Sequence, residues 1–321
     1  MANRPFQVDP VQTAISIGYR NDRLSYIADD VLPRVPVGAS KFSWTFLPIH
    51  QAFTVPNTEV GRRGRLERVE FNGEERTSET KDYGLEDSIP QSDIDDAKAM
   101  RTRGLGTFDP VDTATTLLTD LILIDREVRV ATMVQNPANY APDKRLALSG
   151  SDRFSDPASD IIGTLKAAFN STLVFRPNTV TMGREAWSGI SSHPQLVNAV
   201  KGNVTSKGII SPAEFVELFA GEGLKKLNIG EAFINTSRRG QAPSLSRVWG
   251  KSISLTYINP SARPEQSATF GMTAQYGTRV AGSYEDKNIG LDGGLVVRVG
   301  ERVREVITAP DAGFLIQNAV A

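Results

Sequence analysis

The sequence predicts a mixed α+β fold, in which a charged β-hairpin and one long helix precede a later block of strands and helices. Apolar residues step by three and four between residues 110 and 135, which is typical of a helix. Residues 252–258 alternate in polarity like a half-buried strand, and residues 295–299 are similar. About half of the residues between 59 and 86 are charged, with the two signs nearly balanced. Such a segment holds too few apolar side chains to form a core of its own.

The first 36 residues predict an N-terminal arm. Prolines at positions 5, 10, 33 and 36 interrupt this segment, and only a short helical turn around residues 11–17 is expected. We therefore predict a largely extended arm. Burial of Ile15 and Ile17 is expected to dock it.

Residues 37–92 predict an extended loop built as a β-hairpin. Strand-like sequences at residues 41–46 and 66–71 are expected to pair, and Asn72-Gly73 tolerates the positive φ angles of a tight turn. An isolated two-stranded hairpin is marginal in water, so we expect it to fold onto a neighbouring subunit; a merely solvated hairpin is the alternative. The residues expected to make this contact between subunits are Arg62, Arg63, Arg65, Arg68, Glu74 and Glu75.

The clearest helix begins after Asp109, an N-cap acid that is followed by a proline in the first turn. It is expected to end near Gln135, before Pro137. A helix of about 25 residues spans about 37 Å, which suits the spine of a subdomain. Its predicted apolar seam consists of Ala114, Leu117, Leu121, Ile124, Val128 and Ala131, widened by Leu118 and Ile122.

Shorter elements follow the long helix. A second helix is predicted to begin at Asp156-Pro157, and Ser211 with Glu214 forms a capping box that opens another. Short helices are expected near residues 185–187 and 194–200. Strands are expected over residues 179–182 and, as the last element, 313–316.

Composition restricts the function classes. The chain of 321 residues has no cysteine, so disulfides and thiolate metal sites are excluded. Its 36 basic and 37 acidic residues leave no basic footprint for tight nucleic-acid binding. No apolar run approaches the length of a membrane span, and the N-terminal sequence lacks the features of a signal peptide. We therefore expect a soluble, intracellular protein.

The reactive groups of an enzyme are scarce. There are only two histidines, His50 and His193, in unrelated contexts; we interpret His193, before Pro194, as a cap or surface residue. No phosphate-binding glycine loop, zinc motif or nucleophile elbow occurs. The acidic run from Asp93 to Asp96 lacks the glycine and distal glutamate of a calcium loop, so we interpret it as a solvated turn capping the next helix. No catalytic, metal or cofactor site is predicted, and the protein is not expected to be an enzyme.

The order of these parts resembles that of the major capsid proteins of tailed bacteriophages, which have the HK-ninety-seven-type fold. The segment from Ala28 to Val37, with Pro33 and Pro36, is similar to the family's junction between arm and extended loop. The other stretches that carry the resemblance are PNTVTMGREAW at residues 177–187, LSRVWG at residues 245–250 and APDAGFLI at residues 309–316.

The resemblance implies an icosahedral shell of pentamers and hexamers around double-stranded DNA, located in the virion and assembled in the bacterial cytoplasm. It implies an arm (1–36), an extended loop (37–92), a peripheral domain (93–170) with its spine helix (110–135), an axial domain (171–300) that partly returns to the peripheral domain, and a C-terminal strand (301–321). The stretch before Pro33 is too short for a cleaved scaffolding segment, so a separate scaffolding protein, or none, is implied; a portal is a further expected partner, and a cement protein is a candidate one. Contact with packaged DNA should be loose.

Two other functions remain open from the sequence. An encapsulin-like compartment would have the same fold around enzyme cargo, and an intracellular hydrolase with paired carboxylates would be a small oligomer. Megadalton particles would exclude the hydrolase. The contents of the particles, DNA or enzymes, would separate the two shells.

Overall fold

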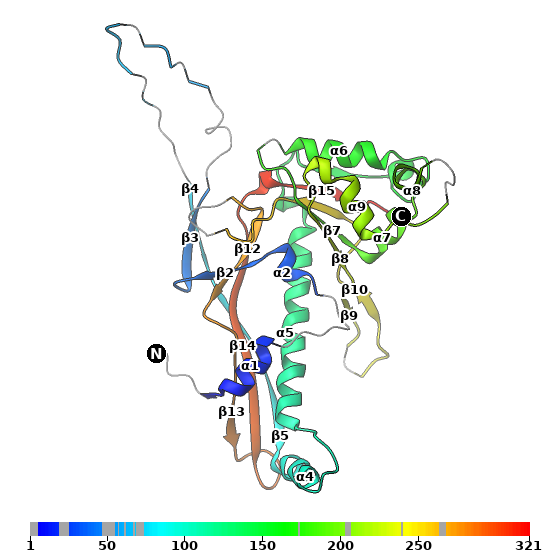
Figure 1. The fold of residues 1–321 in the computed structure, drawn as a ribbon. Helices are drawn as coiled ribbons and strands as arrows, with labels where there is room; N and C mark the ends of the chain where they lie inside the picture. Colours follow the sequence, from blue (N-terminus) through cyan, green and yellow to red (C-terminus); the bar gives the residue numbers. More distant parts are fainter. Residues whose placement is uncertain are drawn as a thin grey trace.

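The structure, a computed structural model, describes residues 6–18, 26–46, 55–56, 58–60, 62–66, 68, 74–172, 174–202, 207–238, 240–262 and 268–321. Figure 1 shows an elongated part, in which a six-stranded sheet lies along the helix α5, and a compact part at one end of that helix. A five-stranded sheet with helices α6 to α9 around it forms the compact part.

The strands are β1 (Gln7–Val8), β2 (Arg34–Val37), β3 (Lys41–Phe46), β4 (Glu74–Glu79), β5 (Lys81–Pro90), β6 (Arg145–Ala147), β7 (Thr179–Gly183), β8 (Lys226–Gly230), β9 (Phe233–Asn235), β10 (Leu245–Arg247), β11 (Ile253–Thr256), β12 (Gly271–Tyr276), β13 (Val280–Asp286), β14 (Gly294–Ile307) and β15 (Gly313–Gln317). The α-helices are α1 (Pro10–Gly18), α2 (Ala28–Val31), α4 (Gln91–Thr102), α5 (Pro110–Val134), α6 (Ile161–Ser171), α7 (Arg184–Ser191), α8 (Pro194–Lys201) and α9 (Pro212–Leu218). Short 3-10 turns are η1 (Pro137–Asn139), η2 (Gly150–Asp152), η3 (Ala220–Glu222) and η4 (Pro310–Ala312).

The strand β14 organises the six-stranded sheet. Its first half pairs with β13 and its second half with β12, while β5 pairs along its other edge. The strand predicted at residues 295–299 is therefore confirmed but is much longer. It crosses residues 300 and 301, where the sequence-based division placed a domain boundary. The arm contributes both edge strands in the order β1-β13-β14-β12-β2 of the six-stranded sheet, because β1 pairs with β13 and β2 pairs with β12.

The long helix α5 is confirmed with its predicted cap, since the Asp109 side chain accepts the Val111 N–H at 2.9 Å. Its buried face packs on the sheet through Ala114, Leu118 and Ile122. The predicted seam is partly wrong, because Leu117 and Leu121 are 59% and 55% exposed. The helix carries two adjacent apolar stripes, and the sheet covers the one that contains Leu118.

The five-stranded sheet has the order β6-β15-β11-β7-β8. The predicted strands at 179–182 and 313–316, both short helices and the Ser211 capping box are confirmed. The helix predicted from Asp156 begins instead at Ile161, capped by Asp160. Asp156 closes a tight turn by accepting the Ala158 N–H, so this earlier acid–proline pair starts no helix.

A pair of glycines makes room for Trp249. Gly183 and Gly230 lie opposite each other on β7 and β8, and the buried indole of Trp249 packs where a Cβ at Gly230 would lie. We expect Gly230→Ala to lower the free energy of unfolding by about 2 kcal/mol, because the rigid ring cannot withdraw from a packed core. Chemical denaturation of the unassembled protein measures this change. Gly221→Ala, where a Cβ meets nothing, is the control, and equal stability of both variants would contradict the prediction.

Candidate interaction surfaces

The charged hairpin exists, but with a different register from the predicted one. β3 pairs with β4, so that Lys41 lies opposite Glu79 and Phe46 opposite Glu74. The prediction that residues 66–71 pair with β3 is wrong; Leu66 is described and lies in no strand, while residues 67 and 69–71 lie outside the described residues. The partner of β3 lies later in the chain than predicted, at residues 74–79. The reason is that β4 continues almost directly into β5, and β5 is paired with β14 in the six-stranded sheet.

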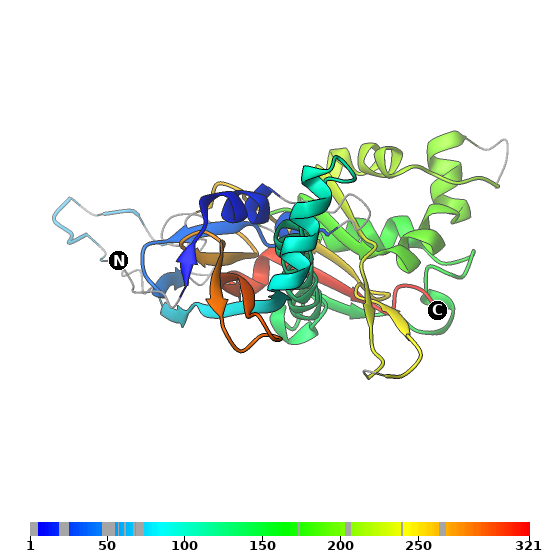
Figure 2. The ribbon, with the colours of Figure 1, turned by 90° about the horizontal axis from the view of Figure 1, so that it is seen from below.

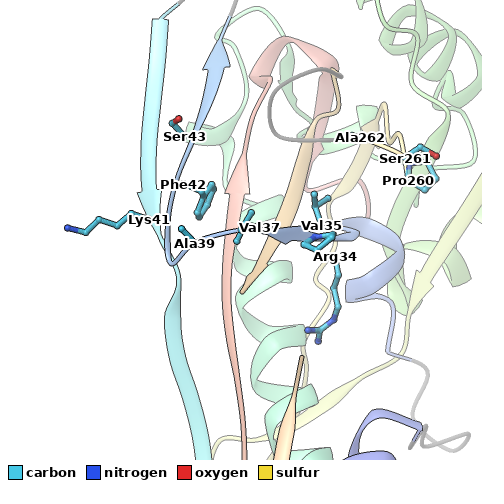
Figure 3. Close-up of a pocket in the computed structure, with 12 residues that line it drawn as sticks. Arg34, Val35, Val37, Ala39, Lys41, Phe42, Ser43, Pro260, Ser261 and Ala262 are labelled. Atoms are coloured by element: carbon cyan, nitrogen blue, oxygen red, sulfur yellow. The ribbon is translucent and has the colours of Figure 1, made fainter. Parts of the chain in front are cut away.

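The base of this ribbon is anchored by aromatic residues. Trp44 is buried with Val35, Met272 and Val306, and Phe42 stacks on it with ring centroids 5.9 Å apart. An open groove of about 850 Å³ lies beside this base, between β2, the start of β3 and residues 260–262 (Figure 3). Lys41 points away from the groove in this view. No group of acids or histidines suited to a metal ion occurs among the described residues.

The predicted contact residues of the loop are all exposed. Arg62, Arg63, Arg65 and Arg68 lie between β3 and β4, and Figure 1 places the described parts of this segment away from the rest of the fold. None of these four arginines forms an ion pair with another described residue. Glu74 and Glu75 begin β4, and Glu74 pairs with Arg76 at 3.1 Å. The loop thus presents its charges to solvent, and their contact with another subunit stays a prediction.

The arm is held by polar contacts more than by the two predicted isoleucines. Thr13 donates to the Ala281 carbonyl at 3.0 Å, and Thr119 of α5 donates to Ser16 at 3.0 Å. Ile15 is half-buried and Ile17 is 54% exposed. Docking of the arm by burial of Ile15 and Ile17 stays a prediction. The arm is also less extended than predicted, because it contains α1 and α2.

Two neighbouring residues of α5 hold α2 at both of its ends. The Glu127 carboxylate accepts the N–H groups of Ile27 at 3.1 Å and Ala28 at 2.8 Å. Arg126 donates to the Leu32 carbonyl at 3.2 Å and pairs with Asp29. This junction therefore fixes the chain just before it enters the ribbon.

The same junction continues into the sheet as a network of alternating charges. Glu301 of β14 accepts from Arg34 at 2.9 Å and from Arg279 at 3.1 Å, and Arg279 also donates to the Ser16 carbonyl. Trp249 donates its indole N–H to Glu127 at 2.6 Å. The arm, the spine helix, the six-stranded sheet and Trp249 thus meet in one buried polar cluster. Sequence reasoning missed it, because the contacts that join Glu127 to Ile27, Trp249 to Glu127 and Arg34 to Glu301 link residues a hundred or more positions apart.

The pKa values of the two glutamates of this cluster are shifted in opposite directions. Burial raises the pKa of the Glu127 carboxyl above its usual value, and the hydrogen bonds from Trp249, Ile27 and Ala28 only partly offset this. Burial would also raise the pKa of Glu301, but the charges of Arg34 and Arg279 outweigh it and hold the pKa below the usual value.

These shifts predict an acid-sensitive fold that depends on Glu301. When the pH falls below the usual glutamate pKa of 4.5, Glu301 is protonated in the unfolded chain but remains ionised in the folded protein. The free energy of unfolding therefore decreases as the pH is lowered. Glu127 acts with the opposite sign, because its contribution is lost as pH rises above that value. We expect Glu301→Gln to lower stability near neutral pH by about 2 kcal/mol and to flatten the loss below pH 4.5. Urea titrations across pH test this, and parallel pH curves for variant and wild type would contradict it.

Other predicted sites resolve as structural features. His193 is a buried helix cap whose ring accepts the Gln195 N–H at 3.3 Å, so the cap prediction is confirmed. His50 lies outside the described residues. The acidic run 93–96 is not a turn but part of α4. In the part of the chain that the structure describes, no helix combines the length and apolarity of a membrane span.

Comparison with known proteins gives long matches. No family model matches the sequence. The chain is 44% identical over its full length, and that of the relative, to the major capsid protein of Pseudomonas phage JBD67. It is 27% identical to the major capsid protein of Burkholderia phage BcepMu, covering 97% of this chain and 96% of the relative.

Solved structures share the fold. A crystal structure of a phage-related protein from Bordetella bronchiseptica superposes with a TM-score of 0.74 at 24% identity, covering 98% of each chain. A virus-like particle from Pyrococcus furiosus has a TM-score of 0.52 at 9% identity, covering 95% of this chain and 96% of that one. At these sequence identities, the two structures show only that the fold is shared.

Proposed function

Because the chain belongs to the phage major capsid proteins, we propose that its copies assemble into a closed icosahedral shell that encloses the double-stranded DNA of a tailed phage. The observation that carries this proposal is the 44% identity to a major capsid protein over the whole of both chains. The projecting β3–β4 ribbon supports it, since Arg62, Arg63, Arg65 and Arg68 are exposed between its strands and form no ion pair with another described residue.

Within such a shell, the proposed parts are the arm (1–36), the extended loop (37–92), the peripheral domain (93–170), the axial domain (171–300) and the C-terminal strand (301–321). Repeated head-to-tail contacts close into rings where the rotation allows. Many modest contacts then give a nearly irreversible shell through multivalency. The exposed loop arginines Arg62, Arg63 and Arg65 would fix the register through complementary charge.

The proposed partners follow from the same role. A separate scaffolding protein and a portal would direct assembly in the host cytoplasm, and a cement protein could bind outside. Packaged DNA would make loose contacts with scattered lysines and arginines, since the chain has a net charge of −1.

Electron microscopy of the purified protein, with and without its neighbouring genes, tests the proposal. We expect closed shells tens of nanometres across, because each copy would make the same set of contacts with its neighbours and such repeated contacts close. An encapsulin-like compartment is the second candidate, since the fold is shared with a virus-like particle. Shells that take up enzymes and no DNA would favour it, and small oligomers under every condition would contradict both.

A further inference from the structure

The hairpin of β9 and β10 is a second projecting ribbon, which the sequence analysis did not predict. The two strands form a sheet of their own that joins neither larger sheet. Figures 1 and 2 both show the hairpin standing out from the compact part. Phe233 is 39% and Leu245 is 69% exposed. Because a lone two-stranded ribbon is marginal in water, a surface that covers it would stabilise it.

The hairpin combines apolar side chains with positive charge. Residues 232–251 include three arginines and one lysine and no acidic residue. Phe233 lies directly opposite Arg247, whose guanidinium sits 4.6 Å from the ring centroid. Alternation along each strand places Leu245 on this same face. Arg238, further out, is exposed.

The spine helix carries a surface of the complementary kind. Leu117 and Leu121 are four residues apart, so they share one face of α5, and they are 59% and 55% exposed. Asp125 follows one turn later with a side chain that is 57% exposed. Asp125 pairs with Arg129 of the next turn, but Arg129 also pairs with Glu305 at 3.0 Å and lies 3.7 Å from the Tyr83 ring centroid, so its charge is divided between two acids. This face of α5 thus offers two leucines and an acid.

We propose that the β9–β10 hairpin of one copy docks on the Leu117–Leu121 face of α5 in an adjacent copy. Phe233 and Leu245 would lie against the two leucines, and Arg238 would approach Asp125. The contact is head-to-tail, because the two surfaces differ. Positive charge alone would also suit DNA phosphates, but the exposed phenylalanine and leucine favour a protein surface. This proposal rests on the proposed function, which brings copies together.

The absence of cysteine from the sequence allows a direct test. Leu121→Cys and Leu245→Cys are made in separate copies, mixed, assembled and oxidised. We expect covalent dimers on a non-reducing gel from the mixture and at least tenfold fewer from either variant alone. Leu291→Cys, which replaces a side chain that is 97% exposed elsewhere, replaces Leu121→Cys in the control mixture and should give no dimer above background.

Each result has one meaning. Mixed particles without dimers above the control would overturn the docking proposal while leaving the shell intact, whereas absence of particles from the wild-type chain would count against the proposed function. If the cysteine variants do not assemble, a charge exchange decides. Arg238→Glu and Asp125→Lys should each raise the protein concentration needed for assembly several-fold, and the double variant should restore it. Loss of DNA retention by Arg238→Glu with unchanged assembly would overturn the proposal in favour of a DNA contact.

Discussion

Replacing Glu127 with alanine should lower the free energy of unfolding of the unassembled subunit by about 3 kcal/mol. The carboxylate accepts three buried donors, the backbone N–H groups of Ile27 and Ala28 and the indole N–H of Trp249. Alanine would leave all three without a partner and would open a cavity beside them. Urea denaturation measures the loss. Faster amide exchange of Ile27 and Ala28 would locate it.

Two further variants separate the causes. Glu127→Gln keeps an acceptor of nearly the same shape, so we expect about half the loss, and Trp249→Phe removes one donor without emptying the site. Glu217→Ala makes the same substitution at an exposed position of a helix, α9, and should change stability by less than about 0.5 kcal/mol. A Glu127→Ala protein as stable as this control would show that α2 is held by other contacts.

Local signals predicted much of the fold. The acid–proline cap at Asp109, the capping box at Ser211 and the strand at residues 179–182 are set by neighbouring residues, and the structure confirms them. The fold class and the resemblance to phage capsid proteins were also correct. Asp156-Pro157 shows the limit of such signals. It is an acid–proline pair like Asp109-Pro110, but Asp156 closes a turn, and the helix α6 begins only five residues later, at Ile161.

What sequence reasoning missed depends on contacts between distant residues. Leu117 and Leu118 fit a helical seam equally well, and only the position of the sheet decides that Leu118 is buried. The partner of β3 follows from β5 being held by β14. Arg126, Glu127 and Glu301 look like ordinary surface residues in the sequence. Nothing local indicates that Arg126 and Glu127 hold α2 or that Glu301 pairs with Arg34 of β2.

Reversing Arg62, Arg63 and Arg65 to glutamate should prevent normal shell assembly while leaving the subunit folded. Each exposed ion pair contributes only about 0 to 1 kcal/mol, but reversal replaces attraction by repulsion in every copy. A loss of about 1.4 kcal/mol per contact already raises the concentration needed for assembly about tenfold. Light scattering and electron microscopy measure assembly. Denaturation should show unchanged stability, because the three side chains are exposed and form no ion pair with another described residue.

A matched reversal separates position from net charge. Arg103, Lys207 and Lys225 are exposed basic residues outside the loop, so changing them to glutamate alters the net charge equally. If the loop arginines meet acids on a neighbour, only the loop variant should fail, and high salt should partly rescue it by screening the repulsion over a few ångströms. Equal defects in both variants would instead mean that overall charge limits assembly. Normal shells from the loop variant would remove these arginines from the contact and leave the ribbon to act through its backbone and apolar residues.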